Sequence, residues 1–217
     1  MMHRIFFAFI WIIGRVLLWI YRVDVKGLEN LPKHSVLLCP NHSTDLDPVL
    51  IGLCLPLDYH LHFMAKAELF DNRALAWLIR TLGAFPVQRD GKDIQSIKTA
   101  MQVLHKGENL LIFPEGTRTT PGQPMQLQRG AANIAVRCQA DLRLAHIICQ
   151  PTTLTKQESW YHIPARKPHF HVIISEKVAV DPFLVDAPTP AVAARRLTDF
   201  LTNALMPTEQ GLAWERQ

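Results

Sequence analysis

The segment SVLLCPNHSTDLDPVLIGLCLP, residues 35–56, contains in succession an apolar run, a polar turn and a second apolar stretch. The apolar run at 35–39 has the length of a buried strand. Residues 46–56 are predicted to form a helix, because Pro48 is well tolerated in the first turn of a helix. A strand that passes through a short turn into a helix is the repeating unit of α/β domains.

The same alternation of short apolar runs and helical spacing continues along the chain. We expect further strands at 60–65, 83–89, 109–113, 142–150 and 169–180. We expect further helices at 72–82, from Asp93 until Gly107, at 129–140 and at 188–205. The pattern predicts a single α/β domain over residues 24–206, followed by a loose tail over 207–217. Its sheet should be mixed, mostly parallel and covered by helices on both faces.

Length and composition narrow the class of protein. The 217 residues suffice for one good core, whereas two full domains would be cramped. Hydrophobic residues make up 48% of the chain and charged residues 19%, which disfavours extensive disorder. The net charge of +4 and pI of about 9.0 suit an anionic partner such as membrane phospholipid or a phosphorylated substrate. No basic run with interleaved aromatic residues occurs, so nucleic acid is disfavoured as a partner.

The four cysteines lie in apolar or helical stretches, and none forms a CxxC pair. A free cysteine in such surroundings behaves as a small hydrophobic residue. We therefore predict reduced thiols in the core, which is compatible with a reducing compartment.

Residues 5–21 are strongly apolar, but Arg15 interrupts them and Arg4 and Arg22 flank them. A spanning helix needs ~20 mostly apolar residues, and a central arginine costs at least about 2.5 kcal/mol there. No small-residue cleavage site of a secretory signal follows. We predict a membrane-associating helix over 1–23 that lies in the interface, where the arginine side chain can reach water. A helix packed on the core and a true span are the alternatives.

The polar turn after the first strand contains two candidate catalytic residues, His42 and Asp47. Histidine can accept a proton near neutral pH. A carboxylate on its other ring nitrogen would fix the tautomer and stabilise the imidazolium. In the alternative interpretation Asp45 or Asp47 caps the helix and His42 is only a turn residue. These residues alone do not separate the two interpretations.

A second polar turn follows another apolar run in LLIFPEGTR, residues 110–118. Glu115, Gly116 and Arg118 fall at the carboxyl end of a predicted strand, where open α/β sheets bind ligands. The guanidinium suits a phosphate, and the glycine lets backbone N–H groups approach one. Arg89 leaves another predicted strand in the same way, although a single such arginine is more often a surface ion pair.

Four stretches of the chain, NHSTDLDP, GAFPVQR, FPEGTR and IICQPTTL, resemble the four ordered blocks of the glycerolipid acyltransferase family. That family includes the 1-acylglycerol-3-phosphate acyltransferases. The His-x4-Asp and FPEGTR blocks are highly specific together, in this order and at about this separation. The resemblance covers roughly residues 24–180, and Thr44 stands where the family often has serine.

The resemblance implies roles for individual residues. His42 would be the general base and Asp47 would orient it. Arg89 would bind the phosphate of the acceptor. The FPEGTR block would bind and place the acceptor through Glu115, Gly116, Thr117 and Arg118.

The implied activity is that of a membrane-associated O-acyltransferase on the cytoplasmic face, and residues 24–206 would be its acyltransferase domain. A fatty acyl group would pass from acyl carrier protein or coenzyme A to the hydroxyl of lysophosphatidic acid, forming phosphatidic acid without a metal or prosthetic group. The partners would be membrane phospholipid, the thioester donor and a lysophospholipid acceptor. The chain has no G-x-S-x-G motif, which argues against a serine hydrolase. The alternatives are another acceptor, such as a lyso-aminolipid or a specialised lipid or polyene product, and a catalytically silent lipid-binding module.

Two histidine pairs fall within predicted strands, His60 with His62 and His169 with His171. Each pair would place two imidazoles on one face of its strand. No carboxylate or cysteine lies at ligand spacing around either pair, so we expect solvated histidines rather than metal ligands.

Overall fold

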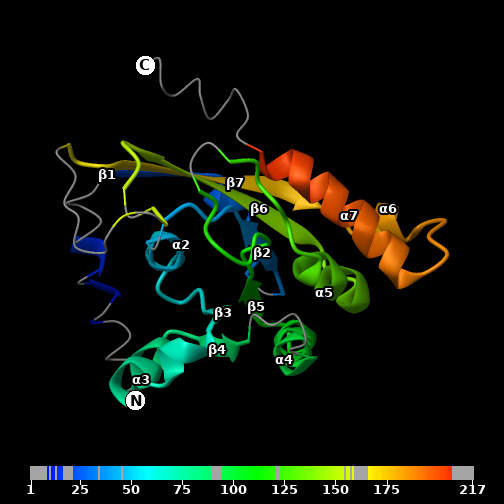
Figure 1. The fold of residues 1–217 in the computed structure, drawn as a ribbon, viewed down its shortest axis with the longest axis horizontal. Coiled ribbons are helices and arrows are strands. Elements are labelled where there is room, and N and C mark those ends of the chain that lie inside the picture. The colour runs from blue at the N-terminus through cyan, green and yellow to red at the C-terminus, as the bar shows by residue number, and fades with distance from the viewer. Residues whose placement is uncertain are drawn as a thin grey trace.

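Figure 1 shows the computed structural model of the chain, coloured along the sequence. The structure describes residues 9, 11–12, 14–16, 22–33, 35–44, 46–88, 94–120, 123–153, 155–156, 158 and 166–206. The tail predicted at 207–217 lies outside the described residues.

A seven-stranded sheet forms the centre of the described chain, in the order β1-β7-β6-β2-β5-β3-β4. The strands are β1 (Arg22–Lys26), β2 (Leu37–Pro40), β3 (Leu61–Lys66), β4 (Ala84–Val87), β5 (Asn109–Leu111), β6 (Leu142–Gln150) and β7 (His169–Val178). Strands β2 to β6 run parallel to one another, whereas β7 is antiparallel to β6 and parallel to β1. The predicted mixed, mostly parallel sheet is therefore confirmed.

Helices cover both faces of this sheet. They are α2 (Asp47–Cys54), α3 (Arg73–Thr81), α4 (Ile94–His105), α5 (Gly130–Cys138), α6 (Asp181–Leu184) and α7 (Pro190–Leu205), with 3₁₀ turns η1 (Leu28–Asn30) and η2 (Ala67–Phe70). Figure 1 shows α2 on one side of the twisted sheet and α4, α5 and α7 on the other.

The core has two halves because successive residues of a strand point to opposite faces. On one face, Leu37 and Leu110 pack with α4, α5 and α7. On the other face, Leu38 and Leu111 pack with α2. Both faces of β2 are fully buried, which explains why its sequence is a continuous apolar run.

Helix α7 illustrates how the sequence specifies these helices. The Thr189 side chain accepts a hydrogen bond from the Val192 N–H at 3.3 Å, and Pro190 occupies the first turn. Side chains that recur on one helical face are buried, namely Ala193, Ala194, Leu197, Leu201 and Leu205. Each buried leucine contributes roughly 1.5–3 kcal/mol, so packing of this stripe holds the helix on the sheet.

One strand and one α-helix were not predicted, the edge strand β1 and the short helix α6. β1 directly follows the apolar N-terminal segment, and its partner β7 is distant in sequence. The local sequence pattern therefore does not distinguish β1 from the apolar segment that precedes it. The predicted core thiols are present: Cys39, Cys54 and Cys149 are buried, and burial raises the pKa of each thiol to about 12.

The described residues of the N-terminal segment, at 9, 11–12 and 14–16, are helical. Trp11 and Arg15 donate hydrogen bonds to the carbonyl oxygens of Leu55 and Leu53, at 3.3 and 3.2 Å. Arg15 thus binds the C-terminal end of α2, where carbonyl groups lack helical partners. The opposite side of the segment exposes Phe9, Ile12 and Val16. Among the described residues, no helix combines the length and apolar character needed to cross a membrane.

Two glycines with similar backbone angles provide a matched test of how tightly β1 packs on β7. Gly27 and Gly107 have φ of +79° and +76°, a region that disfavours side chains by roughly 1–2 kcal/mol. A Cβ on Gly27 would lie 2.1 Å from the carbonyl oxygen of Ile174, whereas one on Gly107 would meet nothing within 4 Å. Gly27→Ala should therefore lower the free energy of unfolding by about 1–3 kcal/mol more than Gly107→Ala. Urea denaturation of both variants measures this difference, and equal losses would contradict the tight packing of β1 on β7.

Candidate active site

The two polar turns identified in the sequence meet between adjacent strands. β2 and β5 are neighbours, but α2 packs on one face of the sheet and α5 on the other. The connections that leave these two strands therefore diverge, and the region between their carboxyl ends is where open α/β sheets place their binding crevice. His42 follows β2 and Glu115 follows β5, so the fold brings both turns to this crevice.

His42 and Asp47 form a hydrogen-bonded pair. The His42 Nδ1 lies 3.0 Å from the Asp47 Oδ2. Asp47 is fully buried, whereas 14% of the His42 side chain is exposed. The imidazole also packs against Phe113, with ring centroids 4.2 Å apart. A buried carboxylate on one ring nitrogen favours the tautomer that carries a proton there and leaves the other nitrogen as an acceptor.

The turn itself holds Asp47 in place. Its Oδ2 accepts hydrogen bonds from the backbone N–H groups of Ser43 and Thr44, at 2.7 and 2.8 Å. The Thr44 hydroxyl donates to Asp47 Oδ1 at 2.7 Å and accepts from the N–H of Leu46 at 3.2 Å. Asp47 therefore organises the turn before α2 and pairs with His42, whereas the first turn of α2 has no side-chain cap, so the capping interpretation of Asp47 is wrong.

Asn41 anchors the beginning of this turn, a role that the sequence did not reveal. Its side-chain oxygen accepts from the N–H of Ile147 at 2.6 Å, and its amide nitrogen donates to the carbonyl of Ile147 at 2.9 Å. The amide thus imitates a backbone unit and extends the pairing of β2 with β6. The only signal in the sequence is an amide-bearing residue directly after the strand.

Glu115 links the second turn to the first. Its Oε1 accepts from the backbone N–H of His42 at 2.6 Å, and its Oε2 accepts from the Thr119 hydroxyl. The side chain is buried, with 3% of its surface exposed. Burial raises the pKa of Glu115 above its ordinary 4.5, and the bonds from Thr119 and His42 oppose this shift. Glu115 thus holds the backbone of His42 in place through a hydrogen bond.

The remaining residues of the FPEGTR turn lie nearer to solvent. Gly116 has φ of +68° and is exposed, and its N–H donates to the carbonyl of Phe113 at 3.0 Å. Thr117 is exposed. Arg118 is half-buried and donates to the carbonyl of Thr155 at 3.2 Å. Arg89, predicted to bind the acceptor phosphate, lies outside the described residues.

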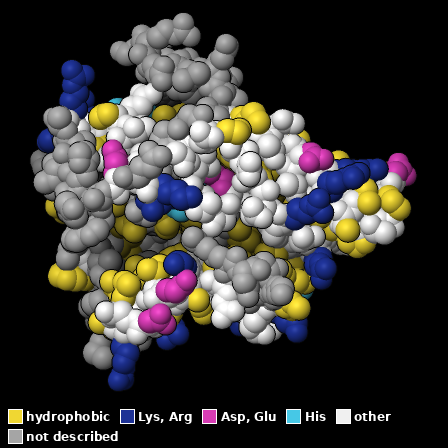
Figure 2. Space-filling model, viewed as in Figure 1, with side chains coloured by type: hydrophobic (Ala, Val, Ile, Leu, Met, Phe, Trp, Pro, Cys, Tyr) yellow, Lys and Arg dark blue, Asp and Glu magenta, His cyan; other side chains and the backbone are white. Residues whose placement is uncertain are grey.

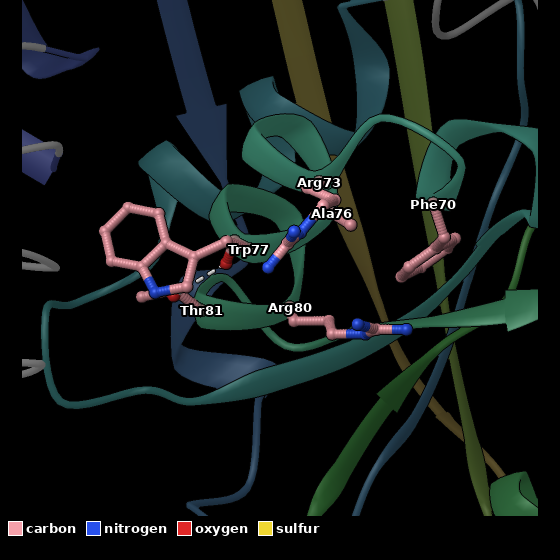
Figure 3. A pocket seen from close by; sticks show the side chains of 6 residues that line it. All are labelled: Phe70, Arg73, Ala76, Trp77, Arg80 and Thr81. Atoms are coloured by element: carbon pink, nitrogen blue, oxygen red, sulfur yellow. Dashed lines mark hydrogen bonds between the residues drawn. The ribbon is translucent and has the colours of Figure 1, made fainter.

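A separate hollow of about 500 Å³ lies on α3, away from His42. Its lining residues are Phe70, Arg73, Ala76, Trp77, Arg80 and Thr81. Figure 3 shows Trp77 and Phe70 at opposite ends of this group, with the two arginines between them. The Arg80 guanidinium lies 5.1 Å from the centroid of the Phe70 ring. The hollow combines two cations with aromatic surface and contains no candidate catalytic residue.

Comparisons with known proteins agree with this architecture. A family model described as Acyltransferase matches residues 22–154. The 1-acyl-sn-glycerol-3-phosphate acyltransferase of Bacillus subtilis (strain 168) is 42% identical over 122 residues, which are 55% of this chain and 59% of that protein. The lyso-ornithine lipid O-acyltransferase of Pseudomonas aeruginosa is 32% identical over 136 residues, which are 62% of this chain and 48% of that protein.

The fold also matches a solved structure. The crystal structure of the 1-acyl-sn-glycerophosphate (LPA) acyltransferase PlsC from Thermotoga maritima aligns with a TM-score of 0.62 and 22% sequence identity, covering 93% of this chain and 80% of that chain. The α/β fold is therefore shared, and because the family model matches more than half of the residues, the chain belongs to the Acyltransferase family. The chain matches less than two thirds of the length of either curated relative.

The Thr44 hydroxyl provides a first test of the site. Thr44→Val keeps the shape but removes the donor to the fully buried Asp47. Leaving that carboxylate oxygen without its donor should lower the free energy of unfolding by about 1–3 kcal/mol. Thr44→Ser keeps the hydroxyl and should lose less than about 1 kcal/mol, mostly through the missing methyl group. Denaturant unfolding distinguishes them, and similar values for the two variants would contradict the bond.

The raised pKa of Glu115 predicts a pH dependence of stability. Between pH 4.5, its ordinary value, and its higher folded pKa, the folded state holds more protons than the unfolded state. The contribution of Glu115 to stability is therefore present at low pH and is lost as the pH rises through the folded pKa. Glu115→Gln cannot titrate, so the stability of the wild type relative to this variant should fall across that window. Unfolding at a series of pH values measures it, and a constant difference would refute the shift.

Proposed function

We propose that this chain transfers a fatty acyl group from acyl carrier protein or coenzyme A to the hydroxyl of lysophosphatidic acid, forming phosphatidic acid. The observation that supports this proposal most is the pair of His42 and Asp47, 3.0 Å apart at the crevice between β2 and β5. Membership in the Acyltransferase family and the 1-acyl-sn-glycerol-3-phosphate acyltransferase among its relatives point to the same chemistry.

In the first step His42 acts as the general base. Its Nε2 takes the proton of the acceptor hydroxyl while that oxygen attacks the carbonyl carbon of the thioester. Asp47 accepts the Nδ1–H, holds the ring in place and stabilises the positive charge that the imidazolium acquires. The attack forms a C–O bond and leaves a negative charge on the former carbonyl oxygen.

In the second step the tetrahedral intermediate collapses. The C–S bond breaks, the ester forms and the departing thiolate receives the proton from the His42 imidazolium. Each turnover returns His42 to its neutral state, so the proton count balances. A covalent enzyme nucleophile is unnecessary because the thioester is already activated. Backbone groups of the turn at Gly116 stabilise the developing oxyanion or help to bind the acceptor.

The acceptor binds through its phosphate and the FPEGTR turn. We assign the phosphate to Arg89 by resemblance, and Arg118 is the second cation near the crevice. Gly116 and Thr117 are exposed in the turn, so an acceptor can reach them. Glu115 is a positioning residue, because its carboxylate holds the His42 backbone and the Thr119 hydroxyl.

The protein acts at a membrane surface, on the cytoplasmic face, where its lipid substrates reside. The exposed apolar side chains of Phe9, Ile12 and Val16 form a stripe at helical spacing that suits the interface. The exposed Trp77, with Arg73 and Arg80 on α3, adds an aromatic residue and two cations of the kind found near phospholipid headgroups. On the face in Figure 2, the Lys and Arg side chains drawn in colour are scattered and do not form the continuous basic patch that is typical of a nucleic-acid interface.

A lyso-aminolipid is the second candidate acceptor. The observation that favours it is the lyso-ornithine lipid O-acyltransferase among the relatives. The same His42 chemistry would serve, since both reactions transfer an acyl group to a hydroxyl. The two acceptors differ in the headgroup, because an ornithine lipid lacks the phosphate that the arginines would bind.

The proposal predicts acyl transfer by the purified protein in mixed micelles, assayed with acyl-coenzyme A and acyl-carrier-protein donors. Lysophosphatidic acid and lyso-ornithine lipid serve as parallel acceptors. His42→Ala should lower the rate by about 10²- to 10⁴-fold, because it removes the general base. Asp47→Asn should also cause a large loss, because it removes the charge that stabilises the imidazolium.

The matched control is His62→Gln, since His62 also pairs with a carboxylate, Glu108, at 3.1 Å but lies on β3 outside the crevice. Its activity should equal that of the wild type. Turnover of lyso-ornithine lipid alone would select the second candidate. Absence of turnover with every acceptor in a folded protein would reject the proposed activity and favour a silent lipid-binding module.

A further inference from the structure

The register of β1 on β7 gathers three side chains that are far apart in the sequence. Asp24 lies opposite His171, and Arg22 lies opposite His169, in the parallel pair. Phe170 and Val172 belong to the core half on the α2 side, so the alternate residues His169 and His171 point to the other face. Asp24 points to that same face.

The potential ligand atoms of this cluster are close together. His169 Nε2 lies 2.7 Å and His171 Nδ1 lies 3.6 Å from Asp24 Oδ2. All three ligand atoms lie within 4.8 Å of one another. Ligand atoms of a tetrahedral zinc ion are roughly 3.3 Å apart, given bonds of about 2.0 Å. Small side-chain movements would therefore bring all three atoms onto one ion.

We propose that Asp24, His169 and His171 form a binding site for a divalent transition metal ion, with zinc as the preferred ion. Two imidazoles and one carboxylate suit zinc, cobalt or nickel, whereas magnesium and calcium prefer sets of oxygen ligands. The three residues leave at least one coordination position for water or another ligand.

The surroundings of the cluster suit an entering ion. His171 is 8% exposed and fixed within the sheet, whereas Asp24 is 51% exposed and provides the route from solvent. The two imidazole rings have centroids 4.0 Å apart, which agrees with the short separation of their ligand nitrogens.

This site is distinct from the catalytic crevice. β7 and β2 are separated by β6, which places them roughly 10 Å apart at ordinary strand spacing. His42 packs against Phe113 on the α2 side of the sheet, whereas the cluster lies on the opposite face. An ion at the cluster would cross-link the edge strand β1 to β7. It should therefore act on stability rather than on the transfer reaction.

The test is zinc binding by the full chain in detergent, after treatment with a chelator, measured by competition with a chromophoric zinc indicator. We expect one tight equivalent per chain and a rise in the unfolding temperature with zinc. Asp24→Asn and His169→Gln should each weaken zinc binding by more than about 100-fold, because loss of a ligand should cost more than the roughly 10- to 100-fold effect of outer-shell changes. These two side chains are partly exposed, so both variants should fold, which circular dichroism verifies.

Two control variants locate the bound ion. His62→Gln removes a half-buried histidine that also pairs with a carboxylate, and His42→Ala removes the catalytic pair. Both should retain the tight equivalent, and magnesium or calcium should not compete for it. Cobalt absorption bands that vanish in His169→Gln would support the same ligands. The proposal is overturned if the wild type lacks a tight equivalent, or if Asp24→Asn and His169→Gln bind zinc as tightly as the wild type.

Discussion

The hydrogen bond from the His42 backbone N–H to Glu115 Oε1 joins the two turns on which the rest of the site depends. Each turn ends a buried strand, and the helices that follow pack on opposite faces of the sheet. Without this hydrogen bond, the two diverging connections would not be held in one fixed position relative to each other. The Glu115 carboxylate that accepts this bond is buried, which raises its pKa. Its burial is unfavourable in free energy, and the hydrogen bonds that it accepts offset part of that loss.

Asp47 shows how one side chain can serve folding and chemistry together. Its two oxygens accept bonds from two backbone N–H groups, a hydroxyl and the His42 ring. A buried carboxylate needs such partners, because an unpaired charge in the core is strongly unfavourable. The bonds that organise the turn thus also fix the carboxylate that faces the imidazole. A change at Thr44 would disturb both functions, although Thr44 itself does not touch the histidine.

The edge of the sheet at β1 contains the features that local patterns missed. The sequence suggested that His169 and His171 are solvated, since no carboxylate lies near them along the chain. Parallel pairing with β1 places Asp24 opposite His171, with its carboxylate near both imidazoles. In the N-terminal segment, Arg15 donates a hydrogen bond to the carbonyl of Leu53 at the end of α2, a contact that the sequence did not reveal. In both cases the decisive neighbour comes from a distant part of the chain.

The amino-acid sequence by itself determined the alternation of strands and helices, the buried character of β2 and β5, and the two turns that carry His42 and Glu115. These features follow from hydrophobic periodicity and turn chemistry, which act over a few residues. Only the tertiary structure decided the strand order, the edge position of β1, the bond between Glu115 and His42, and the anchoring of Asn41 by Ile147. Each of these depends on pairing between segments separated by tens to more than a hundred residues, where local propensity carries no information.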